Sequence, residues 1–288
     1  SFADTPVGRA RSILTIHNLR FQGICSADHL KYWSGLWDTL FSYDVFRIND
    51  NEANMFKGGL AYADRVTTVS ETYAREIQTD FYGEGLNSHL WYHREKLSGI
   101  VNGIDVDQWD PRRDSRLPEN YGPEDVLERK WKNKLALQQR LGLTEDAGKF
   151  MVGLISRLTD QKGLDLVNAV FEQMLDDRTQ IVILGTGDPR YEGSFRYFEN
   201  EHRGQVCSCI LYDEGLSHQI YAGADPLLVP SLFEPCGLTQ LIAMRYGTIP
   251  IVRETGGLKD TVEPYNQFNN TGNGFTFDRY ESGLLLDA

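Results

Sequence analysis

Three charged residues, Glu234, Arg157 and Lys162, follow apolar runs that have the length of buried strands. Glu234 lies in a turn between the run 226–229 and a helical pattern, and the two cations follow the run 151–156. In parallel sheets such turns lie at the carboxyl edge, where open α/β folds bind ligands. Two fixed cations there can stabilise a leaving group that gains negative charge, without a metal ion. A solvated surface pair is the alternative for any arginine and lysine this close in sequence.

The elements that must position these residues alternate regularly from residue 150 onward. The patterns predict strands at 151–156, 180–184, 206–212, 226–229, 249–252 and 275–277, and helices between them at 164–175, 189–200, 217–222, 238–246 and 258–262. Such an alternation predicts an α/β fold with a doubly wound parallel sheet. The turn after 184, Gly185-Thr186-Gly187, does not complete a dinucleotide fingerprint.

The first third of the chain has shorter elements. We expect a strand at 12–17, a helix at 54–63, a strand at 65–69 and a helix capped by Ser70. The aromatic residues between 32 and 46 suit an ordinary core better than a sugar platform. A polar, proline-bearing stretch at 105–125 looks like a linker, and a charged amphipathic helix follows at 124–141. Two domains are therefore expected, 1–104 and 105–288.

Composition narrows the classes of function. The chain has 288 residues and a formal net charge of −12, which argues against nucleic acid or an anionic membrane as a partner. No apolar run approaches the about 20 residues of a membrane span. The four cysteines show no disulfide spacing and fit a reducing cytoplasm, and Cys207-Ser-Cys209 is too short for a zinc knuckle. No metal site or cofactor is expected, and the sequence gives no oligomeric state.

Four motifs carry a resemblance to a known family. They are E-P-C-G-L-T-Q with T-G-G-L after it, T-I-H-N-L-x-F-Q-G, A-D-R-V-T-T-V-S and S-R-L-x-x-Q-K-G, which begin at Glu234, Thr255, Thr15, Ala63 and Ser156. They resemble the bacterial glycogen synthases and plant starch synthases. These are retaining glycosyltransferases of the GT-B type, with two Rossmann-like lobes, that move glucose from a nucleotide donor to an α-1,4-glucan. The resemblance implies ADP-glucose rather than UDP-glucose as donor.

The resemblance also implies roles for individual residues. Glu234 would lie at the reacting glucose with His17 beside it, and Arg157 and Lys162 would bind the diphosphate. Asn102, in the hinge segment, would face the donor sugar, although an Asn-Gly turn is the plain alternative. Tyr212 would pack on the adenine, although a tyrosine at a strand end is often part of a core. The remaining substrate-binding candidates are Cys236, Gly237, Leu238 and Thr239 at the sugar, and Thr255, Gly256 and Gly257 with N–H groups toward the phosphate.

An α-configured donor that gives an α-linked product means that the configuration at C1 of the sugar is retained. Retention can proceed through a covalent intermediate, which needs a second carboxylate. A covalent route needs two, but the position eight residues after Glu234 is Ile242. A front-face path is therefore favoured, in which the departing diphosphate takes the acceptor proton. Glu234 would then position the sugar and stabilise its developing positive charge.

Some features depart from the family pattern. Lys57-Gly58-Gly59-Leu60 looks like the family's phosphate loop but precedes the wrong strand, so we interpret it as the end of a helix. The resemblance implies that residues 1–104 are the back half of the acceptor-side lobe and that residues 105–288 are a linker and the nucleotide-sugar-binding lobe. The first lobe is therefore expected to be incomplete and the final helices missing, so weak or absent activity is expected of this chain alone. A nucleotide-sugar epimerase, or a non-catalytic nucleotide- or glucan-binding module, is the alternative function. A bacterial cytoplasm is expected, with a plastid as the alternative.

Overall fold

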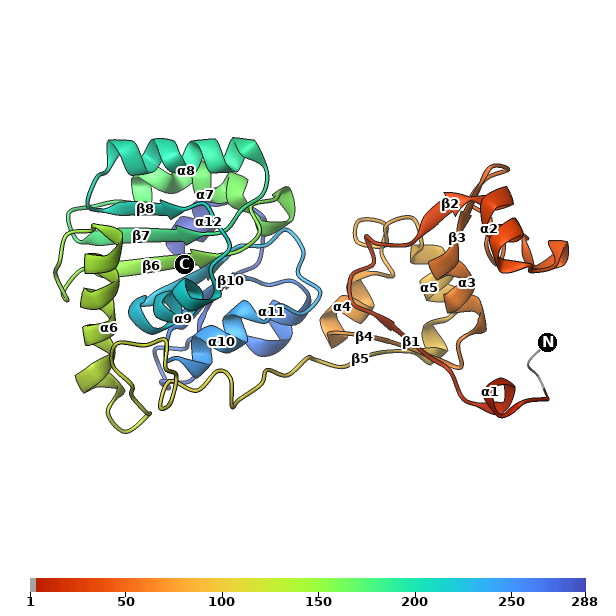
Figure 1. Cartoon of the computed structure of the whole chain (residues 1–288), viewed down its shortest axis with the longest axis horizontal. Helices are drawn as coiled ribbons and strands as arrows, with labels where there is room; N and C mark the ends of the chain where they lie inside the picture. Colours follow the sequence, from red (N-terminus) through yellow and green to blue (C-terminus); the bar gives the residue numbers. More distant parts are fainter. Residues whose placement is uncertain (1–3) are drawn as a thin grey trace. The chain divides into compact units, whose positions relative to one another are not determined.

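The computed structural model describes residues 4–288 and divides the chain into two compact units, 1–101 and 102–288. Each unit has its own parallel sheet (Figure 1). The division falls close to the boundary near Asp105 that composition suggests. The assignment of the first unit to the acceptor side stays a prediction.

The first unit is built on a three-stranded parallel sheet in the order β1-β4-β5. Helices α3, α4 and α5 contribute to the core beneath it, and β2 and β3 form a separate antiparallel pair. The elements are α1 Pro6–Arg9, β1 Ile13–Ile16, β2 Ile24–Ser26, α2 Ala27–Ser34, β3 Glu52–Asn54, α3 Met55–Tyr62, β4 Arg65–Thr68, α4 Glu71–Glu76, α5 Asn87–Tyr92 and β5 Leu97–Gly99, with short 3₁₀ turns at Asp38–Leu40 and Arg94–Lys96.

Two expectations for the first unit need correction. Lys57 lies in the first turn of α3 rather than at a helix end, and its ammonium group donates to the backbone carbonyls of Tyr43 and Arg47. The aromatic residues between 32 and 46 do not form one core, because Trp33 and Trp37 are 73% and 80% exposed. The sequence pattern shows where aromatic residues gather, but not whether a partner covers them.

The second unit is a six-stranded, all-parallel sheet in the order β11-β10-β9-β6-β7-β8. Its elements are α6 Val126–Leu141, β6 Phe150–Ile155, α7 Leu164–Met174, β7 Thr179–Leu184, α8 Pro189–Glu201, β8 Val206–Cys209, α9 Glu214–Gly223, β9 Pro226–Val229, α10 Thr239–Arg245, β10 Ile249–Arg253, α11 Gly256–Thr261, β11 Phe275–Phe277 and α12 Ser282–Asp287, with a 3₁₀ turn at Asp160–Lys162. This is the doubly wound arrangement, in which strand order reverses between β6 and β9.

Helices cover both faces of this sheet (Figure 1). One core cluster joins the sheet to α6, α9, α10 and α11, and the other joins it to α7, α8 and α12. The expected strands and helices agree with these elements within a few residues, except that β8 ends at Cys209 rather than at Tyr212. Tyr212 therefore lies in the loop after the strand.

The stretch 105–125 is packed against the second unit and is not a loose linker. Leu117 and Tyr121 are buried, and the Tyr121 hydroxyl donates to the carbonyl of Tyr246 at 2.8 Å. The ring of Trp109 stacks on the ring of His218, with centroids 4.1 Å apart. This packing could not be predicted from the polar composition of the stretch, because its contact partners lie about a hundred residues further along the chain.

Candidate active site

Lys162 and Glu234 meet at the point where the strand order of the second unit reverses. Lys162 follows β6 and Glu234 follows β9, and the ammonium nitrogen donates to Glu234 Oε2 at 2.6 Å. Both side chains are largely buried, with exposed fractions of 17% and 9%. A crevice at this point is where doubly wound sheets bind ligands. The two residues singled out from sequence thus form a direct ion pair.

Neighbouring side chains hold the Glu234 carboxylate and its turn in place. The Ser231 hydroxyl donates to Glu234 Oε2 at 2.9 Å. The buried Arg253, at the end of β10, donates through Nε to the carbonyl of Ser231 at 2.8 Å and through Nη2 to that of Leu232. Ser231 and Arg253 were not singled out from sequence. Arg253 could have been found, because it is a charged residue at the end of an apolar run.

Two glycines allow the loops around this pair to approach one another. Gly163, after Lys162, has φ +68°, and a Cβ there would overlap the carbonyl oxygen of Pro230. Gly256, at the start of α11, has φ +46°, and a Cβ there would overlap the carbonyl oxygen of Glu234. A side chain at either position would push the turn 231–237, called the Glu234 turn below, away from its neighbours.

Gln240 connects the segment 236–240 to α11 through hydrogen bonds. Its amide nitrogen donates to the carbonyls of Cys236 and Gly237 and to the hydroxyl of Thr261, at 3.1, 2.9 and 3.1 Å. This residue closes the E-P-C-G-L-T-Q motif, but no role was assigned to it from sequence. Leu238 is exposed, Thr239 begins α10, and Gly237 has φ +75°.

Some of the N–H groups at the start of α11 that were expected to face a phosphate donate to backbone carbonyls instead. The N–H of Gly257 donates to the carbonyls of Glu234 and Pro235 at 3.1 and 3.2 Å, and that of Thr255 donates to the carbonyl of Arg253 at 2.9 Å. These two groups serve the local fold in this structure. The idea that they assist a phosphate therefore has no support from their geometry.

Cys236 and Asn102 lie close together. Burial raises the pKa of the Cys236 thiol, and a backbone hydrogen bond from Asn102 acts in the opposite direction. The hinge residue is therefore placed at the Glu234 turn within the second unit. A thiol with a raised pKa is a poor nucleophile. The contact of Cys236 with a sugar stays a prediction.

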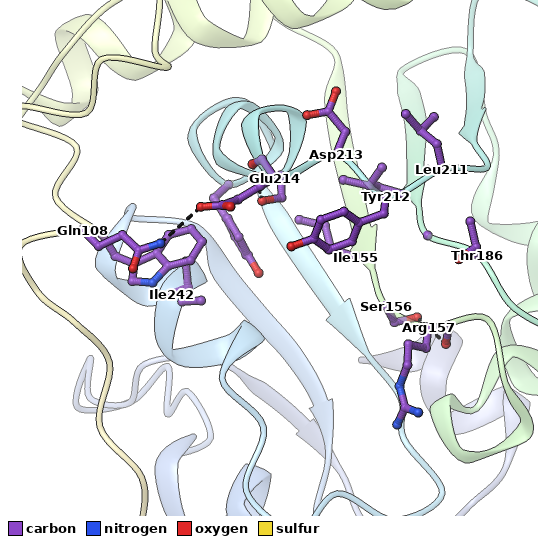
Figure 2. A pocket seen from close by; sticks show the side chains of 15 residues that line it. Gln108, Ile155, Ser156, Arg157, Thr186, Leu211, Tyr212, Asp213, Glu214 and Ile242 are labelled. Atoms are coloured by element: carbon purple, nitrogen blue, oxygen red, sulfur yellow. Dashed lines mark hydrogen bonds between the residues drawn. The ribbon is translucent and has the colours of Figure 1, made fainter.

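A pocket of about 460 Å³ opens beyond the ends of β6, β7 and β8 (Figure 2). Its volume is ordinary for a small-molecule site. Apolar side chains dominate its walls, and Tyr212, which is 87% exposed, lies over it. The lining residues include Ile155, Ser156, Arg157, Leu184, Gly185, Thr186, Leu211, Tyr212, Tyr221 and Ile242. Arg157 thus belongs to both the pocket and the loop that carries Lys162.

One wall of the pocket comes from the stretch before α6. Gln108 and Trp109 line it, and the Gln108 amide donates to Glu214 Oε1 at 3.2 Å, as Figure 2 shows. Behind Trp109, the buried His218 contacts Asp114 Oδ2 through Nδ1 at 2.6 Å. These residues were not singled out, because nothing in the local sequence brings the two segments together.

His17 follows β1 in the first unit and is exposed. Its neighbours are fixed, since the N–H of Leu19 donates to the hydroxyl of Tyr73 at 3.1 Å and the Gln22 amide donates to the carbonyl of Glu84 at 2.9 Å. Its role beside Glu234 stays a prediction, because the two residues belong to different units.

Within residues 4–288, no group of three or more histidine, cysteine, aspartate or glutamate side chains is arranged to hold a metal ion. No helix in the described part of the chain has the length and apolar character to cross a membrane.

Known proteins are similar to this chain in sequence and in fold. The family described as "Starch synthase catalytic domain" matches residues 2–92, and "Glycosyl transferases group 1" matches residues 138–287. The glycogen synthase of Lachnospira eligens is 56% identical over 96% of this chain and 58% of that protein. The glycogen synthase of Lachnoclostridium phytofermentans is 48% identical over the same shares.

Solved structures give the same picture. The catalytic domain of starch synthase IV from Arabidopsis thaliana, bound to ADP and acarbose, superposes with a TM-score of 0.91 at 38% identity, over 100% of this chain and 61% of that one. HepE from Anabaena, in complex with UDP and glucose, has a TM-score of 0.58 at 19% identity over 98% of this chain and 61% of that one, and shows the fold alone.

The parallel sheets, the reversal of strand order between β6 and β9 and these matches define the GT-B fold. The chain belongs to the glycogen synthase and starch synthase family. It spans about 58% of the length of the curated relatives it matches.

Proposed function

We propose that this chain binds ADP-glucose and belongs to an enzyme that transfers its glucose to the non-reducing end of an α-1,4-glucan. The observation that carries the proposal is the buried Lys162–Glu234 pair at the reversal of strand order, together with a pocket that is lined by Arg157 of the Lys162 loop. The ADP-bound starch synthase and the glycogen synthase relatives support the choice of donor and acceptor.

The pocket suits the nucleoside. Adenine would lie among the apolar side chains with the ring of Tyr212 on it, and the diphosphate would extend past Arg157 toward Lys162. The two cations would neutralise the charge that the diphosphate gains as the bond to C1 of glucose breaks. Lys162 would then be shared between Glu234 and the phosphate oxygens.

The sugar would lie at Glu234, whose carboxylate faces the developing positive charge. The oxygen of the acceptor hydroxyl bonds to C1 on the face that the diphosphate leaves, and its proton passes to the departing diphosphate. Asn102, Cys236, Gly237, Leu238 and Thr239 would surround the sugar, and His17 is a further candidate for a contact with it. Arg253 and Gln240 hold the turn without touching the reacting atoms.

Titration calorimetry of this 288-residue chain with ADP and with UDP tests the donor site. We expect ADP to bind more tightly, and Arg157→Ala and Lys162→Ala each to weaken ADP binding. Equal binding of both nucleotides, or unchanged binding in both variants, would refute the assignment. Replacing the residue equivalent to Glu234 by alanine in the full-length Lachnospira eligens relative then tests transfer; retained turnover with intact ADP binding would favour a non-catalytic role for this turn.

We place the enzyme in a bacterial cytoplasm. Bacterial relatives and the four free cysteines support this location.

A further inference from the structure

The segment that joins α11 to β11, taken here with the first two residues of β11 and called the loop 264–276, has an unusual composition. Residues 264–276 read P-Y-N-Q-F-N-N-T-G-N-G-F-T and contain no charged side chain, in a chain that is 24% charged. Three aromatic and five amide side chains take their place. Aromatic faces and amides are groups that contact sugar rings and their hydroxyls, and neither carries a net charge.

The loop presents these groups to solvent. Pro264, Tyr265, Asn266, Gln267, Phe268 and Phe275 line an open pocket of about 560 Å³. Phe268 is 92% exposed, and Tyr265 and Phe275 are 45% and 42% exposed. The rings of Tyr265 and Phe275 lie 5.8 Å apart and form one apolar floor. Phe268 therefore contributes almost nothing to the core.

The loop is held in shape by its own hydrogen bonds. The N–H of Tyr265 donates to the carbonyl of Gly274, and the N–H of Asn266 donates to that of Thr271, both at 2.8 Å. The side-chain oxygen of Asn266 accepts from the N–H of Phe268 at 3.0 Å. The exposed ring thus stands on an ordered backbone, so a ligand would lose little free energy in ordering it.

The same loop is connected to the Glu234 turn through α11. Asn273 Nδ2 donates to the carbonyl of Thr261 at 3.1 Å, and the hydroxyl of Thr261 accepts from Gln240 at the same distance. All of these residues belong to the second unit. A polymer bound at the loop would therefore be attached to the unit that binds the donor.

We propose that residues 264–276 form a second carbohydrate site, which binds a linear α-glucan outside the active site. Sugar rings stack on Phe268 and on the floor formed by Tyr265 and Phe275, and the amides of Asn266 and Gln267 bond to the sugar hydroxyls. The absence of charge from this loop, in a chain of net charge −12, fits a neutral polymer better than a nucleic acid or an anionic lipid surface. Only the identity of the polymer depends on the proposed function; the site needs no catalysis.

Native gel electrophoresis of the 288-residue chain, in gels with and without glycogen, tests the site. We expect glycogen to retard the chain, and Phe268→Ala to raise the apparent dissociation constant about tenfold, the order of magnitude for one lost ring contact. Phe268→Trp should keep the retardation. Phe81→Ala is the matched control, because Phe81 is 69% exposed but lies in the first unit, and it should behave as the unsubstituted chain does.

Further measurements distinguish a second glucan site from binding at the active site and from binding of any polysaccharide. Retention of glycogen binding by Glu234→Ala would show a site distinct from the active site, even if no transfer of glucose were ever found. The proposal is overturned if the unsubstituted chain is not retarded, if Phe268→Ala is retarded as strongly, or if dextran, an α-1,6 polymer, retards it equally. Gln267→Ala, read in the same gels, replaces Phe268→Ala if circular dichroism shows that the latter does not fold.

Discussion

Replacing Lys162 by methionine should reveal the energetic cost of the buried Glu234 carboxylate. The ammonium lies 2.6 Å from Glu234 Oε2, and the two side chains are 17% and 9% exposed. Without it, the hydroxyl of Ser231 still donates to that carboxylate oxygen. Removing one partner of a buried pair costs about 3 kcal/mol or somewhat more, so we expect Lys162→Met to lower the free energy of unfolding by about 3 kcal/mol.

The double variant separates the cost of an unpaired charge from other effects. In Lys162→Met with Glu234→Gln, neither position of the pair carries a charge, so much of the lost stability should return, with a coupling energy of about 2 kcal/mol. Binding of ADP should not return, because the cation itself is gone. Urea unfolding followed by circular dichroism measures the stabilities, and the transition that ADP shifts belongs to the second unit.

A matched control comes from an exposed pair. Lys259 lies 3.3 Å from Glu254, and the lysine side chain is 53% exposed. Lys259→Met should change the free energy of unfolding by less than about 0.5 kcal/mol. If Lys162→Met costs no more than Lys259→Met, or if the double variant shows no coupling, the ion pair does not carry the energy assigned to it.

Three further predictions follow from single positions. Gly256→Ala should destabilise the second unit by about 1–3 kcal/mol in urea because of the overlap with the Glu234 carbonyl, whereas Gly283→Ala, where a Cβ meets nothing within 4 Å, should be neutral or slightly stabilising; equal effects would contradict the packing. Tyr212→Ala should weaken ADP binding about tenfold in calorimetry while Tyr212→Phe keeps it, and an unchanged alanine variant would remove the ring from the site. Burial lowers the pKa of Lys130 from 10.5 to about 7, so between these pH values the unfolded chain binds more protons there. The free energy of unfolding should therefore rise with pH across this window, and Lys130→Met should flatten the rise in thermal unfolding curves; an identical slope in both proteins would contradict it.

The sheet of the second unit could be predicted because each of its strands is a short apolar run between turn residues. The positions of Arg157, Lys162 and Glu234 followed from the same pattern, since loops after parallel strands share one edge. The contact between Lys162 and Glu234 was not predicted. It depends on β6 and β9 being neighbours in the sheet, and the order of strands in a sheet cannot be predicted from local sequence.

Other parts failed for equally physical reasons. Tyr212 was placed on a strand because the apolar run continues past Cys209, where the pairing ends. The N–H group of Gly257 was expected to face a phosphate, but its acceptors, the carbonyls of Glu234 and Pro235, lie about twenty residues earlier in the chain and could not be predicted from local sequence. The aromatic residues Trp33 and Trp37 were assigned to a core by composition, although exposure depends on what packs against them.

The wall formed by Gln108 and Trp109 has a consequence for exchanging lobes between relatives. These residues precede α6, so a crossover at Val126 would take the two sides of one cavity from different parents. A crossover at Asn102 would transfer the cavity whole, together with the stacked Trp109 and His218 rings. The natural module therefore begins well before its first long helix.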